Sequence, residues 1–533
     1  MLNKDVNGDR LVMKVLDLTR EETIQAMREG KVTICVVGLG FVGLPLAVLF
    51  ATEGANVIGC VRTEKSAQKI NKGETRITEH DVSALLSQGA STLEASCPNC
   101  GVRLFKMSQE TFCPSCGRLA SITKFGVHLQ DRVTTVNERI VKSRQSLKDL
   151  LKDSLKSGKL QATPQTVETV QKSDVILITV GTPIDEKNVP DYTDLQAVSH
   201  NVGRGLQKDT LVILKSTVST GTTENLLKPI LEAESKLKAG KDFGLAFMPE
   251  TIKEGHAIYE FRTLPRIVGG ITKRCGNAAA NVFSIFPAPI YVYEKTSVAE
   301  AAKLFMNIYR DVNIALANEL ALTCEKLGIN VIKAINAANI DPKTHLLTPG
   351  LVGGYCLTKD TYHLAYPSKK AGYSPRFITL ARQLNDTMPS HIIELINEVF
   401  REMNTPLKGA RIAVLGLGFK ANTGDLRNTP SAPIIKDLLK RGANVTAQDP
   451  FVQFHELHRI LPELTCTRKI EEAVQGASCT VIATDHLEYR GLTASHLMKF
   501  MSSPCAIVDA RHIIDPNEAV STGVVFRGFG KPR

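Results

Sequence analysis

The stretch "KVTICVVGLGFVGLPLAVLFATEGANVIGCVR", residues 31–62, decides the fold of the first part of the chain. A strand-like apolar run, a glycine-rich turn, an apolar helical segment and a second strand-like run follow one another, which predicts one βαβ unit. Gly38, Gly40 and Gly43 stand at the G-x-G-x-x-G positions. A dinucleotide needs these glycines for a tight turn, for close approach of the backbone to its pyrophosphate, and for close packing of helix on strand. The alternative is a glycine-rich turn that binds nothing, and the flanking strand and helix favour the dinucleotide site.

Strand-like runs and helical stretches alternate beyond this unit. Apolar runs follow at residues 174–183, 210–217 and 243–250, which predicts a parallel sheet in an α/β domain. The strand, glycine turn, helix and strand pattern returns at residues 410–450, and the runs "CTVIATDH" and "CAIVDAR" follow it. The predicted fold class is therefore α/β, with two Rossmann-like doubly wound domains.

A long helix is predicted between the two domains. Residues 297–327 carry apolar side chains at helical spacing without an internal Gly or Pro. We expect this helix to join the domains and to form the interface of a homodimer. The predicted domains are residues 1–296 for dinucleotide binding, residues 297–405 for a central helical domain, and residues 406–533 for a C-terminal domain that binds a nucleotide sugar.

Composition and charge narrow the class of ligand. The 533 residues are 43% hydrophobic and 22% charged, which is typical of a globular protein with several domains. The net charge of +11 favours anionic partners, but Lys and Arg are spread along the chain, so we expect anionic small molecules and no nucleic acid. No signal peptide or membrane span is predicted, and we expect a soluble, cytoplasmic protein.

Four of the twelve cysteines have the spacing of metal ligands. "CPNC" and "CPSC" place Cys97, Cys100, Cys113 and Cys116 as two CxxC pairs within residues 88–146. Four thiolates close a tetrahedron around zinc and leave no open position, so the predicted zinc-ribbon insert holds a structural metal. A metal-free loop with a redox-active dithiol is the alternative.

Cys356 lies in a different setting, "GGYCLTKD", residues 353–360. Gly353 and Gly354 let the backbone approach a ligand, and the helical stretch that follows favours a thiolate at its N-terminus. The other cysteines are expected to be small buried hydrophobes, namely Cys35, Cys60, Cys275, Cys324, Cys466, Cys479 and Cys505.

"GGYCLTKD" resembles the cysteine motif of the UDP-glucose/GDP-mannose dehydrogenase family, whose members oxidise a nucleotide sugar at C6 to the uronate. The resemblance implies two hydride transfers to NAD, with a thiohemiacetal and a thioester on Cys356. "AEAAKLFMN" is similar to the family's central-helix motif, and "GFKANTGDLR" to a motif of its last domain. The resemblance covers most of the chain outside the N-terminal lead-in and the insert.

The resemblance also implies a set of site residues. Lys303 would stabilise the alkoxide or oxyanion and Asn307 would donate a hydrogen bond or hold a water, whereas the alternative for both is a solvated helix face. Asp360 and Glu250 match carboxylates of the family, and which of them is the base stays open. The implied catalytic residues are Cys356, Lys303, Asn307, Asp360, Glu250 and Thr182. The implied cofactor contacts are Gly38, Gly40, Phe41, Val42, Gly43, Arg62, Thr182 and Arg427, and the implied substrate contacts are Lys303, Asn307, Gly353, Gly354 and Lys420.

Several positions depart from the family pattern. Val61 and then Arg62 stand where an acidic residue would bind the adenosine ribose, so NADP is possible beside NAD, although Glu64 or the backbone alone would also serve NAD. Thr358 replaces a proline of many members, and Gly424 replaces an aspartate.

The sugar is expected to be an N-acetylated one. "NIYRDVNIALANEL" and "TLPRIVGG" are similar to the branch that oxidises UDP-GlcNAc or UDP-ManNAc, whereas "GGYCLTKDTYHL" is closer to the UDP-glucose branch. UDP-glucose is therefore the alternative substrate. A hydroxyacid dehydrogenase in which Cys356 is incidental, and a non-catalytic nucleotide-binding scaffold, are the alternatives of other classes.

Overall fold

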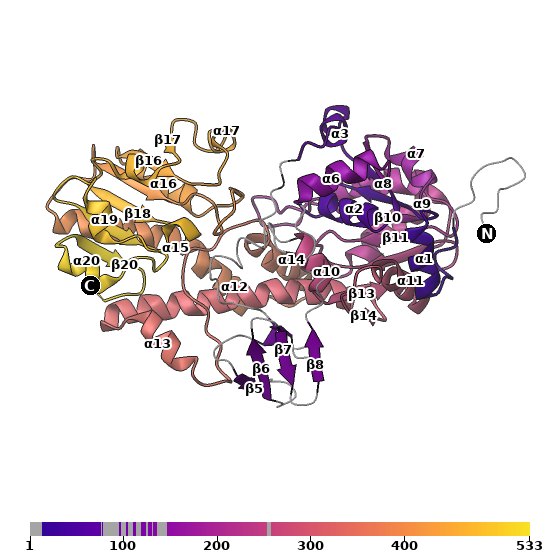
Figure 1. The fold of residues 1–533 in the computed structure, drawn as a ribbon, viewed down its shortest axis with the longest axis horizontal. Coiled ribbons are helices and arrows are strands. Elements are labelled where there is room, and N and C mark those ends of the chain that lie inside the picture. The colour runs from indigo at the N-terminus through magenta and orange to yellow at the C-terminus, as the bar shows by residue number, and fades with distance from the viewer. Residues whose placement is uncertain are drawn as a thin grey trace, which may run out of the picture. The chain divides into compact units, whose positions relative to one another are not determined.

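The computed structural model describes residues 13–75, 77, 146–252 and 257–532, and the backbone of short strands between residues 95 and 135 (Figure 1). The chain divides into two compact units, which are described separately below. The first unit comprises Met1–Thr182 and Asp191–Lys303, and the second comprises Pro183–Pro190 and Leu304–Arg533. The finer division into three domains stays a prediction.

The first unit is built on an eight-stranded sheet. After β1 (Thr33–Val37), the chain adds β2 and β9 on one side of β1 and then β10 to β14 on the other side. Every neighbouring pair is parallel except β12 and β13. The strands in spatial order are β14 (Ile290–Tyr293), β13 (Arg266–Gly270), β12 (Gly244–Phe247), β11 (Leu211–Leu214), β10 (Val175–Ile178), β1, β2 (Asn56–Cys60) and β9 (Leu160–Thr163). The predicted α/β class is confirmed, while β9, β13 and β14 had not been predicted.

Apolar side chains cover both faces of this sheet. Along β1, Ile34 and Val36 join one buried apolar cluster while Cys35 and Val37 join the other. Successive strand residues point to opposite faces, so a continuous apolar run is what a strand buried on both sides requires. The helices of the unit are α1 (Arg20–Arg28), α2 (Gly43–Thr52), α3 (Glu64–Asn71), α6 (Leu147–Lys156), α7 (Thr166–Gln171), α8 (Thr193–Gly205), the π-helical turn η1 (Thr223–Leu227), α9 (Lys228–Ser235), α10 (Ala257–Thr263) and α11 (Lys273–Phe283).

The long helix α12 (Thr296–Leu327) matches the predicted helix within one residue at its start. Its first turns belong to the first unit and the remainder, from Leu304, to the second. A helix of 32 residues spans about 48 Å at 1.5 Å per residue.

The second unit contains an all-parallel six-stranded sheet. Here the chain adds β16 and β17 on one side of β15 (Arg411–Leu415) and then β18 to β20 on the other side. Ile412 and Val414 enter one apolar cluster, and Ala413 and Leu415 enter another, so this sheet is also covered on both faces. Its strands in spatial order are β17 (Thr465–Thr467), β16 (Asn444–Gln448), β15, β18 (Cys479–Ile482), β19 (Ala506–Asp509) and β20 (Val525–Gly528). The second predicted parallel-sheet domain is thus confirmed.

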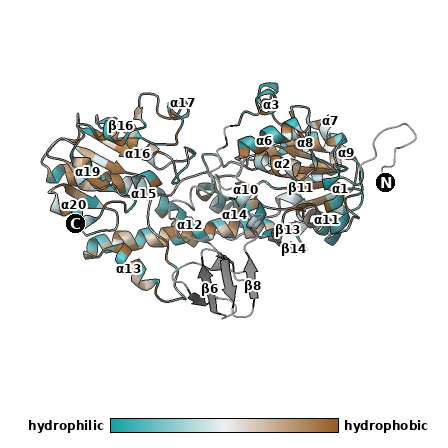
Figure 2. Ribbon diagram, in the orientation of Figure 1, coloured by the Kyte–Doolittle hydropathy of each residue, from teal (hydrophilic) through white to brown (hydrophobic). Residues whose placement is uncertain are grey.

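Besides the later part of α12, three described helices of the second unit precede this sheet in the chain, and the others connect its strands. Figure 2 shows hydrophobic colour on the strands of both sheets, and α14 is more polar than they are. The helices are α13 (Val331–Ala338), α14 (Leu357–Lys370), α15 (Arg376–Glu402), α16 (Ser431–Lys440), α17 (Phe454–Leu457), α18 (Ile470–Val474), the 3-10 turn η2 (Leu487–Tyr489), α19 (Ala494–Met498) and α20 (Pro516–Ser521). Among the helices described, none is long and apolar enough to cross a membrane.

Short antiparallel strands lie within the predicted insert. β3 (Ala95–Ser96) pairs with β4 (Arg103–Leu104), and a separate four-stranded sheet contains β5 (Glu110–Phe112), β6 (Leu119–Thr123), β7 (Gly126–Leu129) and β8 (Arg132–Thr135). The predicted zinc ligands Cys97, Cys100, Cys113 and Cys116 lie outside the described residues.

Candidate active site

The glycine-rich turn between β1 and α2 leaves no space for a side chain at Gly38 or at Gly43, whereas Gly40 faces open space. Gly38 has φ +99°, and a Cβ on it would lie 3.2 Å from the backbone of Thr179. A Cβ on Gly43 would lie 1.9 Å from the carbonyl oxygen of Gly38, so helix and turn approach as closely as the motif demands. Gly40 is exposed and Phe41 is 37% exposed beside it, while Val42 is the N-cap of α2. These residues fit a dinucleotide whose pyrophosphate lies at the N-terminus of α2.

Val61 and Arg62 follow directly after β2, where a ribose-binding acid was expected. Val61 packs against the apolar core of the unit. The Nη2 atom of Arg62 lies 2.7 Å from the Oδ2 atom of Asp194, in the first turn of α8. Both side chains are exposed, at 79% and 53%.

Glu250 lies just after β12 and forms a buried ion pair. Its Oε2 atom is 3.2 Å from the Nζ atom of Lys215, a side chain with no exposed surface. Its Oε1 atom accepts hydrogen bonds from the backbone N–H groups of Thr251, at 2.9 Å, and Ile252, at 3.2 Å. Lys215 also donates to the carbonyl oxygen of Met248 at 3.3 Å. Burial lowers the pKa of Lys215, and the Glu250 carboxylate opposes this shift.

Arg266, at the start of β13, adds a second buried cation. Its guanidinium lies 5.4 to 6.0 Å from the ring centres of Phe261, Phe283 and Phe286. Among the described residues, its two terminal nitrogens have no hydrogen-bond partner. Burial lowers the pKa of Arg266 to about 10, and the Glu250 carboxylate opposes the shift. Neither Lys215 nor Arg266 had been predicted in the site. The signal available was a cation adjoining an apolar strand, directly after β11 for Lys215 and at the start of β13 for Arg266.

Lys303 and Asn307 lie one turn apart on α12. Each is only 7% exposed, which excludes the alternative of a solvated helix face. The Nδ2 atom of Asn307 donates to the Oδ2 atom of Asp360 at 2.5 Å. Of the implied catalytic residues, Asn307 and Asp360 are therefore in direct contact.

Cys356 is the N-cap residue of α14, a helix of 14 residues. It is exposed, and its carbonyl oxygen accepts from the N–H groups of Lys359 and Asp360 at 3.2 and 3.0 Å. A thiol at the N-terminus of a helix lies at the positive end of the helix dipole, which favours the thiolate. Six of the other cysteines in the described chain are buried as predicted, whereas Cys466 is half-buried.

A buried polar cluster lies at the start of α14, and it consists of Asn307 of α12 with Lys359, Asp360 and His363 of α14. The Nζ atom of Lys359 lies 3.2 Å from the Oδ1 atom of Asp360 and 3.3 Å from the Nε2 atom of His363. All four side chains are at least nine-tenths buried. The cluster fixes the Asp360 carboxylate through two partners, and His363 had not been predicted to take part.

The glycines before Cys356 let its loop lie against a loop of the C-terminal sheet. A Cβ on Gly354, which has φ +88°, would lie 2.4 Å from the ring of Phe419, and a Cβ on Gly353 would lie 2.6 Å from the carbonyl oxygen of Asn428. Thr358 donates to the carbonyl oxygen of Gly354 at 2.7 Å and accepts from Asn428 at 2.9 Å. The threonine that replaces proline therefore ties the two loops together. Gly424 is required for a separate reason, since a Cβ there would lie 2.5 Å from the carbonyl oxygen of Phe451.

Arg427 and Lys420 lie in this second loop. Arg427 forms an ion pair with Asp425 at 2.5 Å, and its guanidinium lies 5.5 Å from the ring centre of Tyr355, the residue before Cys356. Lys359 lies 4.9 Å from the same ring. Lys420 is half-buried. The loop thus brings the Arg427 guanidinium against the residue that precedes the cysteine, and the roles of Arg427 and Lys420 in binding diphosphates stay predictions.

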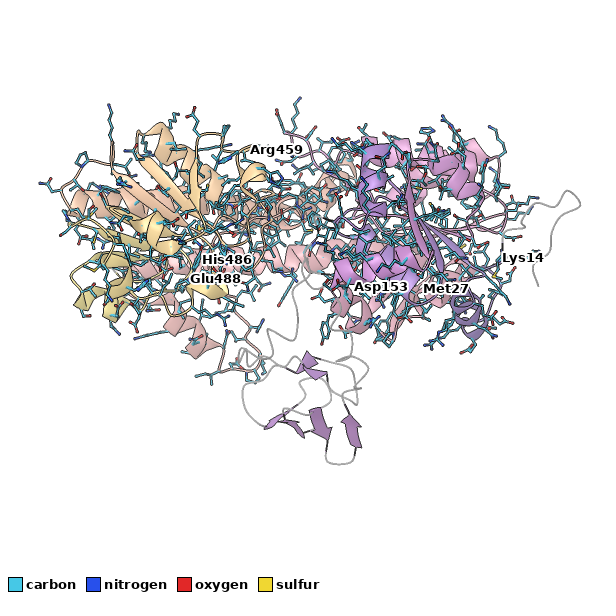
Figure 3. The ribbon with its side chains drawn as sticks, turned by 45° about the horizontal axis from the view of Figure 1, so that its top comes forward. Lys14, Met27, Asp153, Arg459, His486 and Glu488 are labelled. Carbon is cyan, nitrogen blue, oxygen red and sulfur yellow. The ribbon has the colours of Figure 1, made fainter. Side chains whose placement is uncertain are left out.

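The glycine turn after β15 differs from the one after β1. Asp449, directly after β16, accepts at its Oδ2 atom from the N–H groups of Leu417 and Gly418 at 2.7 and 3.0 Å. His486, labelled in Figure 3, lies 3.1 Å from the same oxygen. Burial alone would raise the pKa of Asp449, but these partners hold it below its usual value. A carboxylate thus takes the N–H groups that would face a pyrophosphate, so the second sheet carries no dinucleotide site of the first kind.

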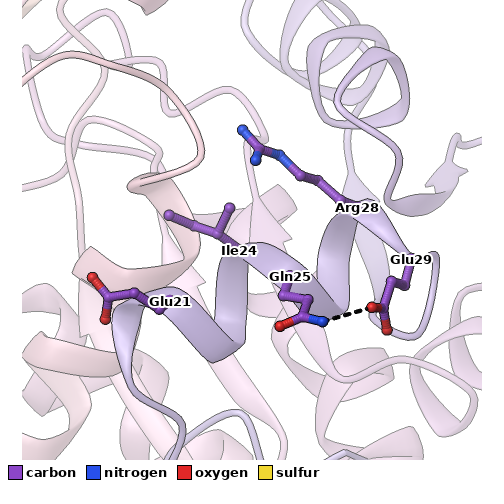
Figure 4. Close-up of a pocket in the computed structure, with 5 residues that line it drawn as sticks. All are labelled: Glu21, Ile24, Gln25, Arg28 and Glu29. Atoms are coloured by element: carbon purple, nitrogen blue, oxygen red, sulfur yellow. Dashed lines mark hydrogen bonds between the residues drawn. The ribbon is translucent and has the colours of Figure 1, made fainter.

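Thr182 and a hollow beside α1 lie outside the clusters described above. Thr182 is buried and donates to the carbonyl oxygen of Thr217 at 2.5 Å, and its implied role beside the cofactor and the substrate stays a prediction. A hollow of about 410 Å³ beside α1 is lined by Glu21, Ile24, Gln25, Arg28 and Glu29, none of which was predicted in the site (Figure 4). Within the described ranges, no group of three or more His, Cys, Asp or Glu side chains is arranged to hold a metal ion.

Known protein families match most of the chain. Residues 32–98 and 126–287 match the UDP-glucose/GDP-mannose dehydrogenase family, NAD binding domain. Residues 297–387 match the central domain of the same family, and residues 413–516 match its UDP binding domain. Residues 81–117 match a different family, described as Sjogren's syndrome/scleroderma autoantigen 1 (Autoantigen p27).

Individual relatives agree over nearly their whole lengths. The chain is 31% identical to UDP-N-acetyl-D-mannosamine dehydrogenase of Pyrococcus horikoshii, over 93% of this chain and 99% of that protein. It is also 31% identical to UDP-N-acetyl-D-glucosamine 6-dehydrogenase of Pseudomonas aeruginosa, over 91% of this chain and 98% of that protein. A solved structure of UDP-D-ManNAc dehydrogenase from Pyrococcus horikoshii matches with a TM-score of 0.74 and 31% identity, over 94% of this chain and 99% of that chain. The chain therefore belongs to the UDP-glucose/GDP-mannose dehydrogenase family of NAD-dependent UDP-sugar dehydrogenases.

Proposed function

We propose that this enzyme oxidises the C6 alcohol of a UDP-N-acetylhexosamine, UDP-GlcNAc or UDP-ManNAc, to the uronate in two successive hydride transfers. The observation that carries the proposal is Cys356 at the N-terminus of α14, next to the hydrogen-bonded pair of Asn307 and Asp360. The N-acetyl sugar is supported by the names of the relatives, which act on UDP-N-acetyl-D-mannosamine and UDP-N-acetyl-D-glucosamine.

The turn of Gly38, Gly40 and Gly43 would hold the pyrophosphate of NAD. When bound, NAD accepts a hydride from C6 of the sugar. In the first oxidation, the C6 hydroxyl loses its proton to a base while the hydride leaves, which gives an aldehyde. Lys303 would stabilise the developing alkoxide, and Asn307 would donate a hydrogen bond to the same oxygen or to a water beside it.

The second oxidation requires the thiolate of Cys356. Its sulfur attacks the aldehyde carbon and forms a C–S bond, and the carbonyl oxygen takes a proton to give a thiohemiacetal. The second hydride then leaves C6 for a second oxidised NAD, and loss of the hydroxyl proton gives a thioester. Water then attacks the thioester carbon, the C–S bond breaks, and the thiolate and the uronate are released.

Two carboxylates would supply the proton transfers. Asp360, held by Asn307 and Lys359, lies in the first turn of the helix that begins at Cys356, which suits it to orient water. Glu250, paired with Lys215, is the other candidate for the base. Lys420 and Arg427 would bind the diphosphates of substrate and cofactor.

We further propose a structural zinc ion on Cys97, Cys100, Cys113 and Cys116, supported by their spacing and donor chemistry. We also propose a homodimer formed through α12. The exposed apolar residues Phe305, Tyr309 and Leu316 recur along one side of this helix and support that interface.

The test is the amount of NADH formed per sugar consumed, with UDP-GlcNAc, UDP-ManNAc and UDP-glucose tried in parallel. Two NADH per N-acetyl sugar are expected. A preference for UDP-glucose would replace the substrate and leave the chemistry intact. One NADH per sugar would indicate a simple alcohol dehydrogenase, and no turnover with any sugar would favour the non-catalytic scaffold.

A further inference from the structure

We propose that Arg62 binds the 2′-phosphate of NADP, so that the enzyme accepts NADP as well as NAD. The proposal rests on the proposed function and concerns the adenosine end of its cofactor. In a dinucleotide site of this fold, an acid after the second strand hydrogen-bonds the ribose 2′-hydroxyl of NAD, while an arginine accommodates the 2′-phosphate of NADP.

The acid that would favour NAD is missing from the end of β2. Val61 occupies the first position after the strand, and its apolar side chain packs against the core. Glu64, the nearest acid along the chain, lies in the first turn of α3, where its Oε1 atom accepts from Gln68 at 3.4 Å. The Glu64 carboxylate thus bonds within its own helix. Along the chain, Arg62 is the first charged residue after β2.

The ion pair of Arg62 joins segments that follow the two strands on either side of β1. Arg62 follows β2 and Asp194 lies at the start of α8, which follows β10 in the chain. In the sheet, β1 lies between β2 and β10, and the glycine turn follows β1. The 2.7 Å contact between Arg62 and Asp194 therefore bridges the carboxyl end of β1, where dinucleotides bind in this class of sheet.

The pair is built so that a phosphate can replace the carboxylate. Both side chains are more than half exposed, and exposed ion pairs are weak. A phosphate offers more oxygens and more negative charge, and it binds a guanidinium through two parallel hydrogen bonds. The hydroxyl of Thr63, the next residue, caps α3 by accepting from the N–H group of Ser66 at 3.3 Å. In the enzyme without NADP, Asp194 pairs with the Arg62 guanidinium, and the 2′-phosphate would replace the Asp194 carboxylate as its partner.

The first arm of the test is the ratio of kcat/KM for NADP to that for NAD. In the unmodified enzyme both nucleotides are expected to support oxidation. Arg62→Ala is expected to lower the ratio by about ten- to hundredfold, the range for a hydrogen bond to a charged group. Asp194→Asn is expected to raise it by about two- to fivefold, because the competing carboxylate charge is lost. Arg204→Ala is the matched control, since Arg204 is an exposed arginine on α8 paired with Glu234, and it should leave the ratio unchanged.

The second arm measures binding without turnover. The full chain should bind adenosine 2′,5′-bisphosphate more tightly than 5′-AMP in titration calorimetry, and Arg62→Ala should abolish that difference. Oxidation with NAD alone, together with equal binding of the two adenosine nucleotides, would overturn the proposal and leave the proposed function standing. If neither dinucleotide supports oxidation of any sugar, the proposed function fails, and the calorimetry alone then decides the role of Arg62.

Discussion

Replacement of Lys215 by Met tests the buried ion pair beside the candidate base. Lys215 has no exposed surface and Glu250 is 10% exposed, with 3.2 Å between the charged atoms. Removal of one partner from a buried pair costs about 3–5 kcal/mol, because the other charge stays buried. Two backbone N–H groups still bind the Oε1 atom of Glu250, and the charge of Arg266 remains nearby. We therefore expect the lower end of the range, about 3 kcal/mol.

Scanning calorimetry measures this loss in the transition of the first unit. A loss of about 3 kcal/mol corresponds to a fall in Tm of about 6 °C or more. The control is Lys238→Met, since Lys238 is 70% exposed and lies 3.5 Å from Glu232. An exposed pair contributes only about 0.2–1 kcal/mol, so Tm should fall by no more than about 2–4 °C.

A double-mutant cycle with Glu250→Gln isolates the interaction itself. If the pair accounts for the loss, the coupling energy between positions 215 and 250 should exceed about 1 kcal/mol. A Lys215→Met variant that loses less than about 1 kcal/mol, or additive effects in the cycle, would refute the reasoning.

The other predictions concern the thiol, the insert and a titrating histidine. Cys356→Ala should abolish uronate formation, because no thiohemiacetal can form, while Cys466→Ala should not, since burial raises the pKa of that thiol to about 12; a normal acid yield from Cys356→Ala would exclude it as the nucleophile. Metal analysis of freshly purified reduced protein should find one zinc per chain, and its removal should lower stability more than the rate of chemistry; protein without zinc would contradict the ribbon. Burial would lower the pKa of His391, but Glu325 at 3.0 Å and Glu394 raise it above 6.5. The stabilisation is therefore complete below pH 6.5 and lost as the pH rises through the raised pKa, so His391→Gln should flatten the fall of Tm above pH 6.5, and an unchanged profile would exclude His391 as its source.

The fold could be predicted where apolar periodicity alone determines it. Residues 31–62 form β1, α2 and β2, and the helix predicted from residue 297 begins at Thr296. The strand β13 was missed because the run Arg266–Gly270 begins with a charged residue and contains two glycines. The aromatic rings around Arg266, together with the Glu250 carboxylate, stabilise a buried cation at that position.

In the candidate site, sequence motifs likewise identified residues, while their burial and their contacts were visible only in the structure. The sequence named Asn307, Cys356 and Asp360 through motifs, but it could not indicate that His363 and Lys359 would be buried beside them, since side chains four residues apart meet only once the helix has formed and packed. The glycines before Cys356 were expected to make room for a ligand. In the structure the ring of Phe419 and the carbonyl oxygen of Asn428, more than sixty residues later in the chain, lie against them.

By itself, the sequence determined the two parallel-sheet domains, the long helix and the family, because these depend on local periodicity and on short motifs whose residues are adjacent in the chain. The tertiary structure decided which charges are buried and which partner each has. Val61 and Asp449 each follow the second strand of a glycine-turn unit, yet one joins an apolar core and the other binds the backbone of its own turn. The physical reason is that burial and hydrogen bonding are set by residues distant in the chain, which only the folded sheet brings together.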